Sequence, residues 1–170
     1  MNNIITTAII AAITLFSLNA EANNVRFNSL DGQGSIEVNV ENNHTFAYVC
    51  MSKGWSEAYV GPTIKLNDFA EVGVGAGIES GCKNLRFGSF LWAAKGKTSV
   101  FCVLEEGGSG QWHKVSADYQ IGKNIKAGLV EQSGLGLGIS SELKLNDQYV
   151  VRVTEFLHGK ELKVAFTIAL

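Results

Sequence analysis

Apolar residues alternate with polar or small residues along most of this chain, and the pattern is clearest at its end. From Leu162 to Leu170 every second residue is a large apolar one, and the residues between them are lysine, alanine or threonine. Successive side chains of a β-strand point to opposite sides, so this segment is predicted to be a strand with one apolar face. After Ala22, no segment shows a helical period.

The same alternation recurs at short intervals through the rest of the chain. Glycine, asparagine, aspartate and histidine stand between the alternating segments, and these residues tolerate the backbone of tight hairpin turns. Pro62 indicates an edge strand or a bulge in its segment. The predicted strands span 25–30, 35–40, 45–51, 56–66, 69–79, 85–94, 98–105, 112–122, 125–132, 134–144, 149–157 and 160–170.

This order predicts an all-β fold, an antiparallel up-and-down meander that closes into a β-barrel of about 8–12 strands. Closure removes the unpaired edge strands that would otherwise invite aggregation. The chain has 170 residues, a length that suits one domain, and no change of composition divides it. The barrel domain is therefore predicted to span residues 23–170.

Residues 1–22 are predicted to be a secretory signal peptide. An apolar stretch from Ile4 to Leu18 precedes Ala20-Glu21-Ala22, which matches the small-x-small pattern of a cleavage site. The alternative is an uncleaved membrane anchor, which the short and interrupted apolar run disfavours. The protein is therefore expected to be exported.

Two arrangements of one barrel fit the alternation. In a soluble barrel the apolar face lies inside, whereas in an outer-membrane barrel it contacts lipid and the polar face lines the lumen. Glycine fills much of the polar face, in segments 73–77 and 134–138, and it suits a strand that neighbouring groups approach closely. The strand lengths also match those that cross a bilayer. Four aromatic residues near strand ends are predicted to lie at the membrane interfaces: Phe69, Trp112, Tyr149 and Phe156.

The chain resembles bacterial outer-membrane β-barrel proteins in two segments. These are Asn67-Asp68-Phe69-Ala70-Glu71-Val72-Gly73-Val74-Gly75 and the closing strand Leu162 to Leu170, which is similar to the assembly signal of those proteins. The resemblance implies location in the bacterial outer membrane, with membrane lipid as a partner. A periplasmic or secreted barrel that binds a small hydrophobic ligand is the alternative.

Net charge, cysteines and histidines limit the partners, disulfides and metal sites that the sequence allows. The formal net charge of -2 gives no reason to expect nucleic acid as a partner. The three cysteines, Cys50, Cys82 and Cys102, allow either one disulfide or three unpaired thiols. The three histidines are scattered, so neither a metal site nor a cofactor is predicted. The sequence gives no indication of an oligomeric state.

No catalytic motif is present, and the chain is predicted not to be an enzyme. A serine-histidine-carboxylate triad would need these groups side by side, and the sequence has no nucleophile-elbow motif to suggest it. A secreted hydrolase is kept as a third hypothesis because carboxylates are present. The favoured function is a structural, adhesion or limited permeation role. Five charged residues are the candidates for lining the lumen: Glu71, Asp118, Lys126, Glu142 and Arg152.

Overall fold

The computed structural model describes residues 22–42 and 44–170, which form one closed antiparallel barrel. Each strand pairs with its neighbours in sequence, and β1 pairs with β12 to close the ring. The twelve strands are β1 (Ala22–Leu30), β2 (Gln33–Asn42), β3 (Thr45–Ser52), β4 (Trp55–Asn67), β5 (Ala70–Glu79), β6 (Arg86–Lys95), β7 (Thr98–Gly107), β8 (Trp112–Gln120), β9 (Ile125–Gln132), β10 (Gly136–Lys144), β11 (Tyr149–Phe156) and β12 (Leu162–Ala169).

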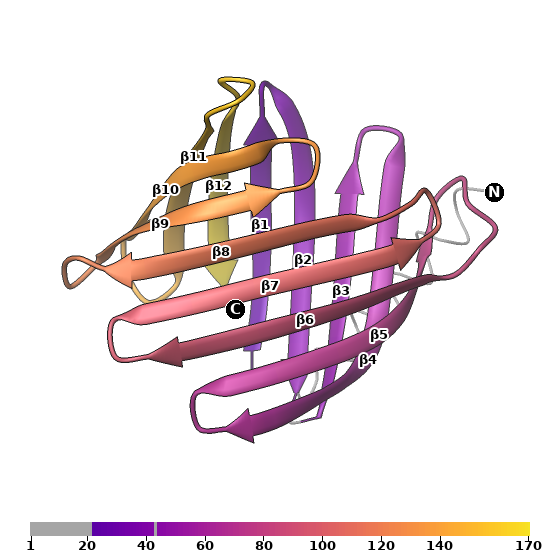
Figure 1. The fold of residues 1–170 in the computed structure, drawn as a ribbon, viewed down its shortest axis with the longest axis horizontal. Coiled ribbons are helices and arrows are strands. Elements are labelled where there is room, and N and C mark those ends of the chain that lie inside the picture. The colour runs from indigo at the N-terminus through magenta and orange to yellow at the C-terminus, as the bar shows by residue number, and fades with distance from the viewer. Residues whose placement is uncertain (1–21, 43) are drawn as a thin grey trace.

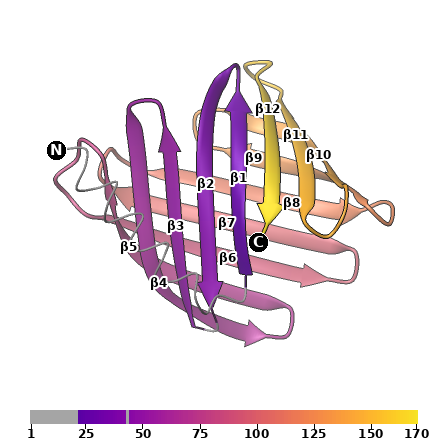
Figure 2. The ribbon, with the colours of Figure 1, turned by 180° about the vertical axis from the view of Figure 1, so that it is seen from behind.

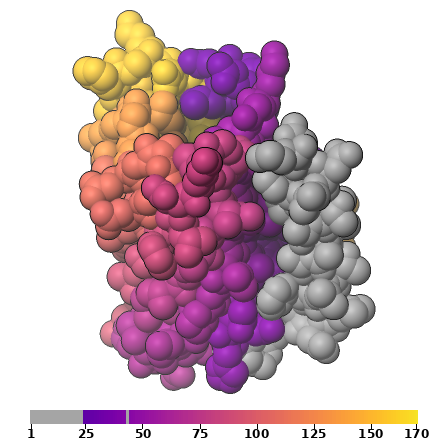
Figure 3. Space-filling model, turned by 90° about the vertical axis from the view of Figure 1, so that its right-hand side faces the viewer, coloured from indigo at the N-terminus to yellow at the C-terminus, as the bar shows by residue number. Residues whose placement is uncertain are grey.

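The strands of the front and back walls cross at a steep angle. In Figure 1 strands β4 to β8 run across the front, and Figure 2 shows β1, β2, β3 and β12 running upright along the back. This crossing is the strand tilt that closure of a barrel requires. Figure 3 shows the colours of successive strands following one another around the surface, with yellow meeting indigo where the ring closes.

The predicted all-β meander is confirmed, and the strand number is the upper limit of the expected range. Strand β9 has the predicted bounds, whereas β10 begins two residues late, at Gly136, because Gly134, with a φ of 82°, lies in the turn before it. Pro62 does not mark an edge strand, because it lies inside β4 and the closed ring has no edges. The register shift in β4 falls between Lys65 and Asn67, not at Pro62. The predicted signal peptide lies outside the described residues, except for Ala22. Among the residues described, no helix is long and apolar enough to span a membrane.

The apolar face of the sheet points outward. Val74, Leu129 and Ile139 from three different strands are each more than half exposed, whereas Ser116 and Ser140 on the other face are buried. Interior and exterior positions alternate along every barrel strand, so the polar and glycine-rich face lines the interior. The alternative of a soluble barrel with an apolar interior is wrong, since its apolar side chains would have to point the other way.

Aromatic rings occupy the space above the interior glycines. A Cβ atom added to Gly73 would collide with the ring of Phe90, and one added to Gly77 would collide with Tyr59. Phe90 also packs edge-on against Phe46, with 5.1 Å between ring centroids. The glycines of β5 therefore make room for rings from β3, β4 and β6 inside the barrel.

Two of the four aromatic residues predicted for the membrane interfaces point inward instead. Trp112 lies opposite Glu105 on the interior face, and Phe156 is 1% exposed. Tyr149 does lie on the outer face, where it stacks on Phe166 with 5.8 Å between the ring centroids. The sequence places an aromatic residue at a strand end, but the strand register decides which side it faces.

The three cysteines are unpaired. Cys50 is opposite Glu37 on the interior face of β3, Cys102 is opposite Leu91 on the outer face of β7, and Cys82 lies in the β5–β6 turn. Of the two alternatives, the structure therefore has three free thiols.

Gly61→Ala should destabilise the barrel by about 1–3 kcal/mol, the usual cost of adding a methyl group where no space exists. The added Cβ would collide with the backbone of Val74 and Gly75, which cannot move aside as a side chain can. Urea unfolding of the detergent-solubilised protein measures the loss. Gly34→Ala is the control, because its Cβ would meet only Asn28 O at 3.9 Å. Equal stability of the two variants would contradict the close approach of β4 and β5.

Candidate functional site

Four of the five predicted lumen residues form one ion-pair network on strands β8 to β11. Arg152 Nη2 donates to Asp118 Oδ1 at 2.5 Å, and Arg152 Nη1 lies 3.5 Å from Glu142 Oε2. Lys126 Nζ lies 2.9 Å from the other carboxylate oxygen of Glu142. The four residues lie on neighbouring strands of the interior face, which is how residues distant in sequence meet here.

Glu71 is not part of this network. It lies on the interior face of β5, opposite Lys65 and Trp92, and its Oε1 atom is buried without a hydrogen-bond partner among the described residues. The structure thus brings four of the candidates together and leaves the fifth on a distant strand. Their role in lining a permeation path stays a prediction.

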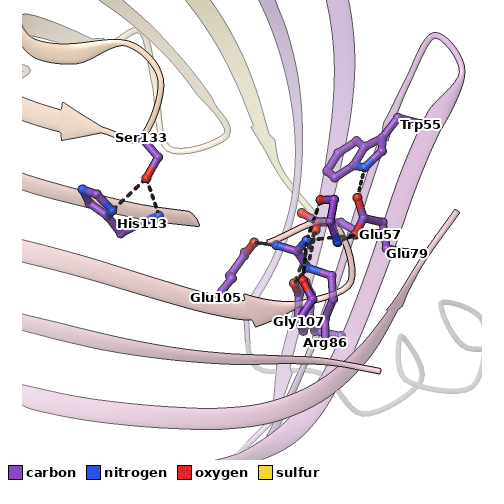
Figure 4. A network of polar contacts seen from close by, with 10 residues as sticks. Trp55, Glu57, Glu79, Arg86, Glu105, Gly107, His113 and Ser133 are labelled. Carbon is purple, nitrogen blue, oxygen red and sulfur yellow. Dashed lines mark hydrogen bonds and ion pairs between the residues drawn. The ribbon is translucent and has the colours of Figure 1, made fainter. Parts of the chain in front are cut away.

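A second charged cluster surrounds Arg86, near the end of the barrel that carries the β5–β6 and β7–β8 connections (Figure 4). Arg86 Nη1 lies 2.9 Å from Glu79 Oε2, and Nη2 lies 3.0 Å from Glu105 Oε2. The Nε atom lies 3.7 Å from Glu57 Oε2. The side chains of Arg86 and the three glutamates are each at most 9% exposed. One buried guanidinium therefore holds three carboxylates from three other strands.

Neutral donors and acceptors complete this cluster. Arg86 Nε donates to the Tyr59 hydroxyl at 2.6 Å, and Trp55 Nε1 donates to Glu79 at 2.6 Å. The Ser109 backbone N–H donates to Glu79 at 2.8 Å, which ties the β7–β8 connection to the interior. Sequence reasoning missed this cluster. The available signal was that the glutamates and Arg86 share the polar face near the same end of successive strands.

On the β8 to β1 side of the ring, four cationic side chains surround a small interior cavity of about 20 Å³, room for about one water molecule. They come from strands β1, β8, β11 and β12, and the wall between them includes Asn28, Thr154 and Phe156. The cationic residues are Arg26, Lys114, Arg152 and Lys163. Sequence reasoning found only Arg152 among these. The other three stand on the polar face of their strands, and that position was the only signal available.

Two of the four cationic side chains at the cavity have carboxylate partners. Arg26 lies 3.5 Å from Glu37, and Arg152 is paired with Asp118 and Glu142. Among the residues that the structure describes, neither Lys114 nor Lys163 forms a salt bridge. The two halves of the interior thus differ in charge: the β8 to β1 side has more cations, whereas the β4 to β7 side carries three carboxylates around Arg86.

Comparison with known proteins gives a likeness in structure alone. No family model matches the chain, and no curated protein matches it in sequence. The KdgM porin in complex with disordered oligogalacturonate superposes with a TM-score of 0.62 at 13% identity, over 87% of this chain and 97% of that chain. The chain has the fold of outer-membrane porins.

Two further structures support the same conclusion. The KdgM porin alone gives a TM-score of 0.57 at 15% identity, again over 87% of this chain and 97% of that chain. A structure from a study of the in-meso crystallisation of membrane proteins gives 0.61 at 8% identity, over 88% of this chain and 83% of that chain. The prediction of the β-barrel fold of bacterial outer-membrane proteins is therefore confirmed. The prediction that the protein is not an enzyme stays a prediction.

Proposed function

We propose that this protein is a narrow outer-membrane channel through which small hydrophilic anions pass in preference to cations. Membrane lipid surrounds the apolar outer face, and the permeating solute is the small-molecule ligand. The observation that carries the proposal is the convergence of four cationic side chains, Arg26, Lys114, Arg152 and Lys163, on one interior cavity. Of the roles predicted from the sequence, permeation is the one that this interior supports.

Rings of charged side chains select ions in channels, because a charge in a narrow polar passage attracts counter-ions and repels ions of its own sign. Lys114 and Lys163 supply the unpaired part of this charge. Asp118, Lys126, Glu142 and Arg152 line the path beside the cavity in this proposal, and Glu71 lines it on the β5 side. The four residues of the ion-pair network hold the wall in place, and their compensated charges contribute less to selectivity than the two lysines do.

The structural likeness to KdgM agrees with an anionic solute. That porin was solved with oligogalacturonate, whose sugar units carry carboxylates. The likeness at 13% identity concerns the fold, so the choice of solute here rests on the cationic cavity of this chain.

The double variant Lys114→Gln/Lys163→Gln should lose most of the preference for chloride over potassium. Removing both unpaired cations leaves the cavity with charges that are already compensated. The measurement is the reversal potential of a planar bilayer containing the protein, under a gradient of potassium chloride. We expect this potential to move toward zero in the variant.

Lys123→Gln is the matched control, because Lys123 lies in the exposed β8–β9 turn outside the barrel interior. It should leave the reversal potential unchanged. A wild-type protein that conducts no ions, or that prefers potassium, would contradict the proposal.

A further inference from the structure

A serine, a histidine and a glutamate lie in hydrogen-bond contact at the end of the barrel that carries the β7–β8 and β9–β10 connections. The Ser133 hydroxyl oxygen lies 2.7 Å from His113 Nδ1, a contact drawn in Figure 4. The other ring nitrogen, Nε2, lies 2.7 Å from Glu131 Oε2. The histidine therefore bridges a hydroxyl and a carboxylate, which is the arrangement of a nucleophile, a base and the group that orients the base.

The contacts fix one set of proton positions for a neutral histidine. If Nε2 carries the proton, it donates to the Glu131 carboxylate, and Nδ1 accepts from the Ser133 hydroxyl. The serine proton then already points at the base that would remove it. The backbone N–H of His113 also donates to the Ser133 oxygen at 2.8 Å, which holds that oxygen in place.

The turn that carries Ser133 supplies a donor for a developing oxyanion. Leu135 N donates to Gln132 O at 3.0 Å, which puts Ser133 and Gly134 at the two central positions of a β-turn. Gly134 has φ +82°, as the third residue of a type II turn requires. Among the described residues, the Gly134 N–H has no hydrogen-bond partner. The amide after the nucleophile is a common oxyanion donor in serine hydrolases.

The three side chains share the outer face with exposed apolar residues. His113 is directly opposite Leu104, and Glu131 is directly opposite Leu137; these leucines are 60% and 48% exposed. Val115 and Leu129 continue the outer face toward the middle of the barrel and are exposed as well. An acyl chain lying against these residues would bring its ester group to the polar trio at the membrane interface.

Pairing at the ends of β8 and β9 does not require the contacts among Ser133, His113 and Glu131. The hydrogen bond from His113 N to the serine oxygen satisfies the strand end by itself, without the histidine ring or Glu131. A carboxylate is also costly on the lipid-facing side of a barrel, less so near the interfaces. The interior channel makes no use of the three side chains, because they are on the opposite side of the wall.

We propose that Ser133, His113 and Glu131 hydrolyse carboxylic esters of acyl lipids at the outer surface of the barrel. Ser133 Oγ attacks the ester carbonyl carbon while His113 Nδ1 takes its proton, and the Gly134 N–H stabilises the oxyanion. The carbon–oxygen ester bond then breaks, and the leaving alcohol takes the proton from His113. Water next attacks the acyl-serine, passes a proton to His113 and releases the fatty acid, and that proton returns to Ser133. Ser133 and His113 are catalytic residues, and Glu131 is a positioning residue.

The test uses the full chain folded into vesicles of phosphatidylethanolamine and phosphatidylglycerol. A fluorophosphonate probe should label the wild-type protein, and free fatty acid should accumulate above the level in empty vesicles. Ser133→Ala should abolish the labelling and lower fatty-acid release by at least about 100-fold, because it removes the nucleophile. Ser141→Ala, which removes an exposed serine on β10, should label like the wild type.

Two more variants distinguish loss of the catalytic groups from loss of the folded barrel. Glu131→Gln and His113→Gln keep Ser133 and should still run as folded, heat-modifiable barrels on a gel, but they should label at least about 100-fold more slowly. Glu131→Gln should also change the pH profile of labelling, because Glu131 orients the base that titrates; a merely structural role would leave that profile unchanged. Channel conductance should be the same in all of these variants. Absence of both labelling and fatty-acid release in the wild type, or equal labelling of Ser133→Ala, would overturn the proposal and leave the channel function untouched.

Discussion

Arg86→Met should destabilise the folded barrel by about 3–5 kcal/mol, the cost of removing one partner of a buried ion-pair cluster. Methionine fills a similar volume but leaves the carboxylates of Glu57, Glu79 and Glu105 without a positive charge. Each of these side chains is at most 9% exposed, so water cannot replace the guanidinium. Urea unfolding in detergent, followed by tryptophan fluorescence, measures the loss.

Lys126→Met is the matched control for this variant. Lys126 also pairs with a glutamate, Glu142, but its side chain is 39% exposed. Partly exposed ion pairs contribute about 0–1 kcal/mol, so the control should lie close to the wild type. If Arg86→Met were no less stable than Lys126→Met, the cluster around Arg86 would not exist as described.

Arg86→Met should also loosen the β7–β8 connection. The Ser109 N–H donates to Glu79, and Arg86 Nη1 donates to the Ser109 hydroxyl at 3.1 Å. Gly107 and Gly108, with φ values of 101° and 53°, let the chain turn toward this cluster. In Arg86→Met, limited proteolysis should therefore cut this connection before the strands on either side of it.

Val74→Arg should oppose folding into a bilayer by about 2–4 kcal/mol, the penalty for arginine on the lipid face near the membrane midplane. Val74 lies near the middle of β5 and is 52% exposed on the outer face. An arginine here would meet hydrocarbon, with no carboxylate on the outer face of β4 or β6 directly opposite, since Val74 is paired with Ser89 on β6. The folded fraction in phosphatidylcholine vesicles at increasing urea measures the change.

Leu145→Arg is the control for the depth of the arginine in the bilayer. Leu145 is similarly exposed, but it lies in the β10–β11 connection at the end of the barrel, where the penalty should fall to about 0–1 kcal/mol. In detergent micelles, which adapt their thickness, the difference between the two variants should shrink. Equal folding of both variants in vesicles would contradict the assignment of this face to lipid.

Strand positions follow from the sequence because strand alternation is a local property. The period of two in segments such as 125–132 marks a strand and divides its residues between two faces without any knowledge of its neighbours. Errors arise at turns, as at Gly134, where the sequence pattern continues although the backbone has already turned. They also arise where a residue type fits both faces of a strand. The sequence suggests that Trp112 lies at the membrane interface, but the strand register places it opposite Glu105 on the interior face.

The charged clusters and the cavity depend on contacts between strands, which the alternation of residues along one strand does not predict. Asp118, Glu142 and Arg152 are recognisable in the sequence as polar-face charges, but only pairing across β8 to β11 brings them within ion-pair distance. Arg26 and Lys163 meet at the cavity because β1 pairs with β12, so residues from the two ends of the chain become neighbours. Such proximity depends on closure of the ring and on the stagger between strands.

The sequence by itself determined that this chain forms an antiparallel meander with one apolar and one glycine-rich face, because side chains of a strand must alternate. It also favoured a lipid-facing apolar side, since glycine on the polar face suits close approach of neighbouring groups and the strand lengths match a bilayer. Only the tertiary structure decided that twelve strands close, that Arg86 gathers three carboxylates, and that Ser133, His113 and Glu131 touch. These contacts join side chains on different strands, and the register and curvature that bring them together are properties of the whole barrel.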